Sequence, residues 1–201
     1  MSIAFALWFV VCEGKNMTHR TLRLPVLLLL SCLALSCAQQ QETLRRQEPA
    51  AAVEVYFSPK GGAEAAIVRE VAKAQHEIRV LAYSYTSAPI HDALVAAHKR
   101  GVQVTVILDK SQRTAKGSKL GSLQAEGVPV FIDAKHAIAH NKVMILDKSR
   151  IITGSFNFTG SAEERNAENL LILDDPSLSK KYLQDFDRHL EHAVVPGVFR
   201  D

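Results

Sequence analysis

Cysteine and aromatic residues are both scarce in this sequence. The 201-residue chain has three cysteines, Cys12, Cys32 and Cys37, and none after residue 37. If the first 38 residues are removed on export, the remaining chain can form no disulfide, thiolate nucleophile or thiolate metal site. Aromatic residues make up 6% of the chain and form no run that would stack the bases of a single-stranded nucleic acid.

An excess of charge of one sign is also missing. The formal net charge is +3, and Lys15, Arg20, Arg23 and Glu13 contribute +2 of it, so residues 39–201 carry only +1. Any site for a polyanion must therefore be local. Hydrophobic residues at 47% and charged residues at 22% are ordinary for one globular domain, and they exclude a mostly disordered, collagen-like or polytopic membrane chain.

The first 38 residues have the pattern of a secretory signal peptide. Arg20 and Arg23 precede an apolar run at residues 24–35, and residues 36–38 have the small-x-small pattern of a cleavage site. The run is shorter than the roughly 20 apolar residues that span a bilayer as a helix. We therefore expect residues 1–38 to direct export, to the periplasm or to the medium.

The start and the processing of this segment are open to more than one interpretation. Met17 would give a conventional start, so that residues 1–16 are either an upstream misassigned start or an extended basic region. Cleavage after Ala38 would release a soluble protein. Leu-Ser-Cys at Cys32 and at Cys37 resembles a lipoprotein signal instead, and an uncleaved anchor is the third form.

Strand and helix patterns alternate after a short polar linker at residues 39–52. Strands are predicted at 53–58, 77–86, 102–109, 128–133, 139–147, 150–158 and 168–174. Helices are predicted at 64–75, 88–100 and 176–192, and a further helix follows the loop at 110–119 and ends near Gly127. The strands at 139–147 and 150–158 are joined tightly at Lys148 and Ser149, which favours a mixed sheet over an all-parallel one. We expect a single α/β domain at residues 53–192, with a mixed β-sheet sandwiched by helices and a tail at 193–201.

Residues suited to phosphate chemistry gather on the two strands joined by this turn. His140 and Lys142 would share a strand face about 7 Å apart, whereas Asp147 has the opposite parity. Ser155 and Asn157 would share a face of the next strand, together with Thr159. If the strands pair, an imidazole, an ammonium, a hydroxyl and a carboxamide converge on one patch, which could attack and hold a phosphodiester.

Each of these residues taken singly is more often structural or simply solvated, so the inference depends on their combination. His-x-Lys-x-x-x-x-Asp followed by Gly-Ser-x-Asn resembles the signature of the phospholipase D superfamily. Residues 53–192 look like the small exported bacterial endonucleases of that superfamily, which carry one such motif per chain. Residues 154–159, Gly-Ser-Phe-Asn-Phe-Thr, and residues 82–86, Ala-Tyr-Ser-Tyr-Thr, carry the resemblance. It implies the phospholipase D/nuclease fold.

The resemblance also implies a role for each motif residue. His140 corresponds to the nucleophile that forms a covalent phosphohistidine. Lys142 and Asn157 correspond to the phosphate-binding groups, with the Ser155 hydroxyl beside them. Glu168, in Asn-Ala-Glu-Asn, corresponds to the carboxylate that orients the histidine through its other ring nitrogen.

Two further consequences follow from the same resemblance. Asp147 corresponds to the motif aspartate, which is usually structural. The mechanism needs a second histidine to protonate the leaving oxygen, and the other histidines lack a lysine two residues later; His136 is the nearest of them. We therefore expect a homodimer in which two copies of His140 share one site, and we expect no metal and no cofactor.

The substrate is less determined than the reaction. Residues 110–119 contain Lys110, Arg113, Lys116 and Lys119 and no acidic residue. They form either a solvated loop or a basic rim that follows a nucleic-acid backbone without reading its sequence. A sequence-nonspecific nuclease acting on DNA or RNA is the preferred interpretation. A phospholipase D that hydrolyses a headgroup phosphodiester is the alternative, and the intact motif argues against a non-catalytic binding protein.

Overall fold

The computed structural model describes Ser36, Gln39 and residues 52–197. The predicted signal peptide with its cysteines, and most of the predicted linker, lie outside the described residues. Residues Ala51–Asp201 form one compact unit. Among the described residues, no helix combines the length and the apolar character needed to cross a bilayer.

Seven strands and five α-helices make up the described part of this unit. The strands are β1 (Ala52–Ser58), β2 (Glu77–Ala82), β3 (Gln103–Asp109), β4 (Val130–Asp133), β5 (Lys142–Leu146), β6 (Arg150–Gly154) and β7 (Glu168–Asp174). The helices are α2 (Ala63–Lys73), α3 (Ala88–Lys99), α4 (Leu120–Ala125), α5 (Gly160–Glu164) and α6 (Pro176–His192), and a 3-10 helix spans Lys110–Arg113.

All seven strands form one mixed sheet in the order β1-β7-β6-β5-β2-β3-β4. β2, β3 and β4 run parallel and are connected by α3 and by α4. β5, β6 and β7 pair antiparallel with their neighbours, and β1 pairs antiparallel with β7 at the edge. The predicted mixed α/β sheet is confirmed. The strands joined through α3 and α4 run parallel, and β5 and β6, which are joined by a tight turn, run antiparallel, as expected from these connection lengths.

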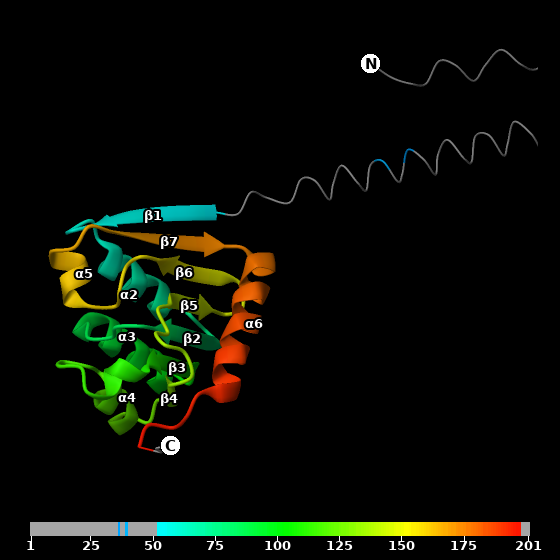
Figure 1. The fold of residues 1–201 in the computed structure, drawn as a ribbon. Coiled ribbons are helices and arrows are strands. Elements are labelled where there is room, and N and C mark those ends of the chain that lie inside the picture. The colour runs from blue at the N-terminus through cyan, green and yellow to red at the C-terminus, as the bar shows by residue number, and fades with distance from the viewer. Residues whose placement is uncertain (1–35, 37–38, 40–51, 198–201) are drawn as a thin grey trace, which may run out of the picture. The chain divides into compact units, whose positions relative to one another are not determined.

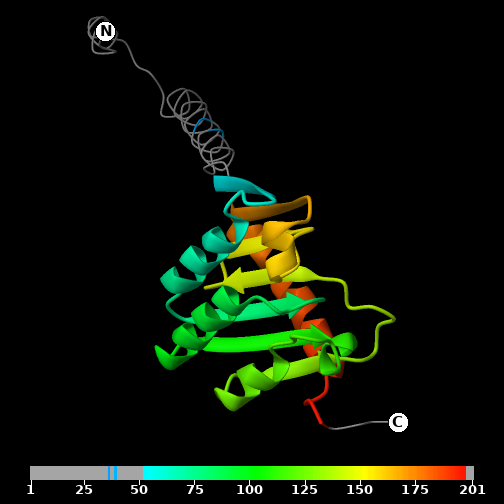
Figure 2. The same ribbon diagram turned by 90° about the vertical axis from the view of Figure 1, so that its left-hand side faces the viewer.

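Helices cover both faces of the sheet. In Figures 1 and 2, α2, α3, α4 and α5 lie on one face and α6 crosses the other. β2 shows how the strand period divides the core: Val80 packs in the larger apolar cluster under α2 and α3, whereas Leu81 packs with Phe186 of α6 in the smaller one. Successive side chains of a strand point to opposite faces, so one central strand contributes to both cores.

Local signals place the beginnings of α3 and α6 where the sequence predicts them. The Ser87 hydroxyl accepts a hydrogen bond from Ile90 N at 3.2 Å, and a proline lies in the first turn of α3. Asp175 caps α6 in the same way, through Ser177 N and Leu178 N. A side-chain oxygen at the N-cap satisfies amides that have no partner within the helix.

Five of the seven strands, β2 to β6, are shorter than predicted, and α5 was not foreseen. β2 ends at Ala82 and β6 ends at Gly154, because the segments that follow leave the sheet and pair through an isolated bridge between Tyr85 and Phe158. β5 begins only at Lys142. At the far end, Val194 of the predicted tail exchanges two backbone hydrogen bonds with Ile132 of β4, so the folded domain continues past residue 192.

Candidate active site

The motif residues gather at one end of the sheet because of the strand directions. Ala82 pairs with Lys142, and Gly154 pairs with Leu170. Since β5 is antiparallel to both β2 and β6, and β6 is antiparallel to β7, four strand termini meet there: the ends of β2 and β6 and the beginnings of β5 and β7. Each contributes residues that precede or follow a strand.

His140 lies in the loop before β5 and not on the strand, which corrects the expected geometry. Lys142 is the first strand residue, and its Nζ lies 3.0 Å from His140 Nδ1 and donates to the His140 carbonyl oxygen at 2.8 Å. On one strand face the two side chains would be about 7 Å apart along the chain. The loop conformation instead folds the imidazole back against the ammonium.

This pair combines an exposed ring with a buried charge. His140 is exposed, whereas Lys142 has only 7% of its surface accessible. Burial lowers the pKa of the Lys142 ammonium, and the Glu168 carboxylate opposes that shift. An ammonium can only donate hydrogen bonds, so in this arrangement His140 Nδ1 accepts and the ring proton lies on Nε2.

Tyr83 belongs to the same site and was not singled out from the sequence. Its ring lies 4.5 Å from the His140 ring, centroid to centroid, and Lys142 Nζ lies 5.1 Å from its centroid. Tyr83 N also donates to Asn141 O at 2.8 Å. The position of residues 82–86 at the carboxyl end of β2 was the available signal, because strand ends of α/β sheets commonly carry site residues.

The segment after β6 crosses the beginning of β5. Ser155 is tied to β7, since Ser155 N donates to Asn169 O and Asn169 N donates to Ser155 Oγ at 3.0 Å. Phe158, three residues later, bridges to Tyr85 beyond β2. Because β5 lies between β6 and β2, the chain must pass its first residue, which brings Ser155 and Asn157 toward the Lys142 end of the sheet.

Glycine is required where this segment departs. Gly154 has φ 148°, and a Cβ there would lie 2.3 Å from the Asn169 backbone oxygen. Phe156 and Phe158 are fully buried, and Thr159 caps α5 through Ala162 N, so the alternate residues point away from the core. The Asn157 Oδ1 atom is nevertheless buried, and no residue within 52–197 forms a hydrogen bond with it.

Glu168 occupies the first position of β7, at the same end of the sheet. Its Oε1 accepts a hydrogen bond from Asn166 Nδ2 at 3.1 Å. Within residues 52–197 no hydrogen bond joins Glu168 to His140, whose Nδ1 faces Lys142 instead. The contact by which Glu168 would orient His140 is therefore not formed in this arrangement, and the role that the resemblance implies for Glu168 stays a prediction.

Asp147 lies at the opposite end of β5 from His140. Its carboxylate accepts hydrogen bonds from the backbone amides of Gln75, His76 and Glu77 at 2.8–3.0 Å. Burial raises the pKa of Asp147, but these three amides outweigh burial and hold it below its ordinary value. Asp147 and Lys148 have φ values of 49° and 60°, which allow the tight turn into β6.

The basic segment begins where β3 ends, at the same end of the sheet as the motif. Lys110 and Lys116 are exposed, whereas Arg113 and Lys119 are partly buried. Lys110 Nζ donates to His136 O at 3.0 Å, in the loop that leads to His140. The segment therefore adjoins the active-site loop, and its contact with a substrate stays a prediction.

One cluster among the described residues could hold a metal ion, and sequence reasoning missed it. It consists of Asp133, His136, His189 and His192 and does not include the motif residues. The available signals were two pairs with identical spacing, Asp-x-x-His after a strand and His-x-x-His at the end of a helix. Sequence alone did not show that the two pairs meet.

Known proteins are similar to this chain in both sequence and fold. A family model described as cardiolipin synthase, PLD-like domain, matches residues 67–190. A phospholipase D of Rickettsia conorii is 40% identical over 187 residues, which are 92% of each chain. The crystal structure of Nuc, a phospholipase D family member from Salmonella typhimurium, has a TM-score of 0.69 at 35% identity and covers 71% of this chain and 96% of its own.

NucT from Helicobacter pylori is similar as well, with a TM-score of 0.67 at 26% identity, covering 72% of this chain and 98% of that one. The family match at residues 67–190 includes β5, which begins at Lys142, and its neighbours β2 and β6. The similarity to the relatives covers most of the described domain. Together with the motif at the end of the sheet, these similarities show that the chain belongs to the phospholipase D superfamily of phosphodiesterases.

Proposed function

We propose that this protein hydrolyses phosphodiesters without a catalytic metal, through a phosphohistidine, and that nucleic acid is its substrate. The observation that carries the proposal is the exposed His140 ring held against the buried Lys142 ammonium. An accessible nucleophile next to a fixed positive charge suits a phosphate group, whose non-bridging oxygens carry the negative charge.

The reaction divides into two displacements. His140 Nε2 attacks phosphorus, the bond from phosphorus to the leaving oxygen breaks, and the second histidine gives that oxygen a proton. Water then attacks the phosphohistidine, its proton returns to the second histidine, and the phosphorus–nitrogen bond breaks. Lys142, Asn157 and Ser155 hold the non-bridging oxygens in both steps, so charge is neutralised by residues already in place.

Attack by Nε2 requires the ring proton to lie on Nδ1. In the described arrangement Lys142 Nζ faces Nδ1, so the proposal includes an exchange of partners. A bound phosphate draws the Lys142 ammonium to its own oxygens, and the ring turns so that Nδ1–H donates to Glu168. Glu168 is close enough for its charge to act on Lys142, which supports this exchange.

The second histidine comes, in this proposal, from a second copy of the chain. His136 is the histidine nearest to His140 in sequence, but its Nδ1 lies 2.8 Å from Asp133 Oδ2. Its ring is thus engaged in another cluster. A two-fold dimer that places both His140 rings on one phosphate would supply the missing acid and base.

Nucleic acid is favoured by the basic segment. Lys110 and Lys116 are exposed at the end of the sheet that carries the motif, and no acidic residue interrupts residues 110–119. Such contacts to phosphates bind backbones of any sequence, so cleavage should be nonspecific.

We also propose that the protein works outside the cytoplasm, because residues 1–38 have the pattern of a secretory signal peptide.

A phospholipid substrate is the second candidate, and one observation favours it. Ile138, two residues before His140, is 57% exposed, and it could contact an acyl chain beside the headgroup. The similar Rickettsia conorii protein is also named phospholipase D. One apolar side chain is a small contact area, and we therefore place nucleic acid first.

The test offers both substrates to the same purified protein in excess EDTA. We expect cleavage of plasmid DNA and little headgroup release from phosphatidylcholine or cardiolipin vesicles. His140→Ala should abolish turnover, while His98→Ala, on α3 away from the motif, should retain it. Circular dichroism is recorded in parallel, so that loss of activity by unfolding is distinguished from loss of chemistry.

The outcomes separate the proposals clearly. DNA cleavage that disappears in EDTA, while the protein stays folded and His189→Gln still cleaves without EDTA, would show that the chemistry needs a metal. Faster headgroup release than DNA cleavage would reverse the order of substrates. Full activity of His140→Ala would show that another residue is the nucleophile.

A further inference from the structure

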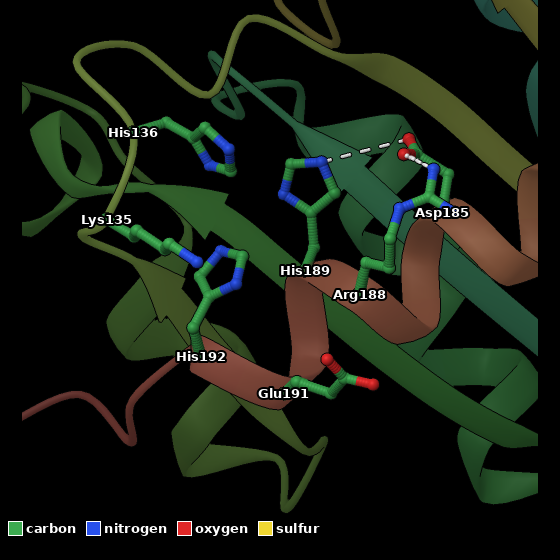
Figure 3. A pocket seen from close by; sticks show the side chains of 7 residues that line it. All are labelled: Lys135, His136, Asp185, Arg188, His189, Glu191 and His192. Atoms are coloured by element: carbon green, nitrogen blue, oxygen red, sulfur yellow. Dashed lines mark hydrogen bonds and ion pairs between the residues drawn. The ribbon is translucent and has the colours of Figure 1, made fainter.

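A second polar cluster lies outside the active site described above. Asp133 ends β4, His136 lies in the loop between β4 and β5, and His189 and His192 lie at the end of α6. One ligand atom from each of the four residues lies within 4.8 Å of the others. Figure 3 shows the three imidazole rings converging on a common hollow beside the helix.

The separations fit a single ion between the four side chains. Asp133 Oδ2 lies 2.6 Å from His189 Nδ1, 2.8 Å from His136 Nδ1 and 3.3 Å from His192 Nε2. In a tetrahedral zinc site with bonds of about 2.0–2.1 Å, neighbouring ligand atoms are about 3.3–3.4 Å apart. Small rotations of two rings away from the carboxylate would create that spacing.

Hydrogen bonding alone leaves the cluster incompletely satisfied. The Asp133 carboxylate is fully buried, and three ring nitrogens face one of its oxygens. His192 Nε2 is buried and forms no well-aligned hydrogen bond with any described residue, although it lies 3.3 Å from Asp133 Oδ2. Buried polar atoms normally have partners, and a cation at the centre would be the common partner of all four.

The surroundings hold the four side chains in the orientation that a metal needs. The other Asp133 oxygen, Oδ1, accepts the backbone amides of Lys135 at 3.0 Å and His136 at 3.3 Å. His189 Nε2 lies 3.8 Å from Asp185 Oδ2, one helical turn earlier (Figure 3). A carboxylate behind the non-coordinating nitrogen of a histidine ligand is the usual arrangement around zinc, since it orients the ring and strengthens its donor atom.

We propose that Asp133, His136, His189 and His192 bind one Zn²⁺ ion in a closed structural site. A set of three imidazoles and one carboxylate suits Zn²⁺, whereas Mg²⁺ and Ca²⁺ prefer oxygen ligands and would find only one of the four. Four protein ligands leave no position for water, so the ion takes no part in hydrolysis. It fastens the end of α6 to the loop that continues into His140.

The ion has a route into this site. The His136 side chain is 47% exposed, whereas Asp133 is fully buried and His189 nearly so. The hollow in Figure 3, of about 440 Å³, opens beside His136 and is also lined by Lys135 and Arg188. A zinc ion can therefore enter from solvent past His136 and reach the buried Asp133 and His189 without any opening of the sheet.

The first experiment measures metal on the purified full chain without a histidine tag. Metal is first removed from the protein with a chelator, and the chelator is then removed. Zn²⁺ is added, and the bound zinc per chain is measured by inductively coupled plasma mass spectrometry. We expect one Zn²⁺ per chain above the count for His189→Gln and for His192→Gln. The difference is used because Cys12, Cys32 and Cys37 could bind zinc on their own account.

A matched control and two independent readouts complete the design. His98→Gln changes a histidine of α3 outside the cluster and should bind as the natural chain does. Saturating Zn²⁺ should raise the melting temperature of the natural chain and of His98→Gln by about 5–10 °C and leave His189→Gln unchanged. Co²⁺ in place of Zn²⁺ should give the visible absorption of a tetrahedral complex, whereas Mg²⁺ and Ca²⁺ should have no effect.

Equal zinc counts in the natural chain and in both cluster variants would overturn the proposal. So would a melting temperature of the natural chain that Zn²⁺ does not change, because this result needs no variant to fold. The proposal does not depend on the substrate or on the phosphohistidine. A chain that binds zinc but cleaves no phosphodiester would support this site and refute the proposed function.

Discussion

Asn157 shows at the scale of one residue how the active site conflicts with stability. Its Oδ1 atom is buried and has no hydrogen-bond partner among the described residues, and its chain neighbours Phe156 and Phe158 are fully buried. A polar atom in that condition costs about 1–3 kcal/mol relative to a satisfied one. Such a cost is understandable where the amide waits for a phosphate oxygen, because binding sites often hold polar groups whose partner is the ligand.

Asn157→Leu should therefore stabilise the protein and inactivate it. We expect the free energy of unfolding to rise by about 1 kcal/mol, because the unsatisfied polar atom is replaced by apolar atoms of similar volume. Turnover should fall by at least about 100-fold, because one transition-state contact is lost. Urea denaturation and cleavage assays measure the two effects, with the exposed Gln124→Leu as the control. A less stable Asn157→Leu would show that the amide is already satisfied in the free protein.

At the scale of the elements, an ion-pair network around the buried Glu70 carboxylate fastens α2 to the sheet. The Glu70 side chain is fully buried and pairs with Arg69 and Lys73 of its own helix and with Arg150 at the start of β6. Arg150 also reaches Asp174 of β7 at 2.8 Å. Burial raises the pKa of Glu70, but its cationic partners outweigh burial and hold the pKa below its ordinary value.

Glu70→Gln should destabilise the protein in a pH-dependent way. Because the folded-state pKa lies below the unfolded one, the carboxylate stabilises the fold above the unfolded value of about 4.3, and this contribution is lost as pH falls through the folded value. We expect a loss of about 2 kcal/mol at pH 7 that shrinks below about pH 4. Denaturant unfolding across this range measures it, with Glu126→Gln, from an exposed pair with Lys99, as the control. A difference that is constant with pH would contradict the ionised pairing.

At the scale of the whole molecule, one chain presents half of the proposed reaction. His140 is exposed at the end of the sheet, and His136 turns its ring toward Asp133. The reaction needs both an attacking and a proton-donating imidazole. Two identical sites on a two-fold axis can divide these tasks, because one ring can be neutral while the other is protonated.

Mixed dimers give a quantitative test of the shared site. If natural and His140→Ala chains are unfolded together in equal amounts and refolded, only dimers of two natural chains should cleave DNA. Activity should then be about a quarter of that of the same total amount of natural protein, since partners combine at random. About one half would remain if each chain worked alone, and that result, or an active monomer in light scattering, would refute the shared site.

The sequence by itself predicted the mixed sheet and every strand and α-helix except α5, and it identified the motif residues, whose catalytic roles stay predictions. Helical and strand periodicity predicted α6 at its observed bounds and predicted the mixed sheet, because that periodicity records which side of each element is buried. The histidine, lysine and asparagine of the motif were recognisable because their types and spacing are rare in combination.

Only the tertiary structure decided how these residues meet. His140 lies in the loop before β5 with its ring against Lys142, and Tyr83, which directly follows β2, contacts both. Gly154 ends β6 where the Asn169 backbone comes too close for a side chain. The cluster around Asp133 joins side chains up to 59 positions apart along the chain, from Asp133 to His192. The physical reason is the same in each case: local periodicity reports burial, whereas a contact between distant segments depends on which strand ends and helix ends the topology brings together.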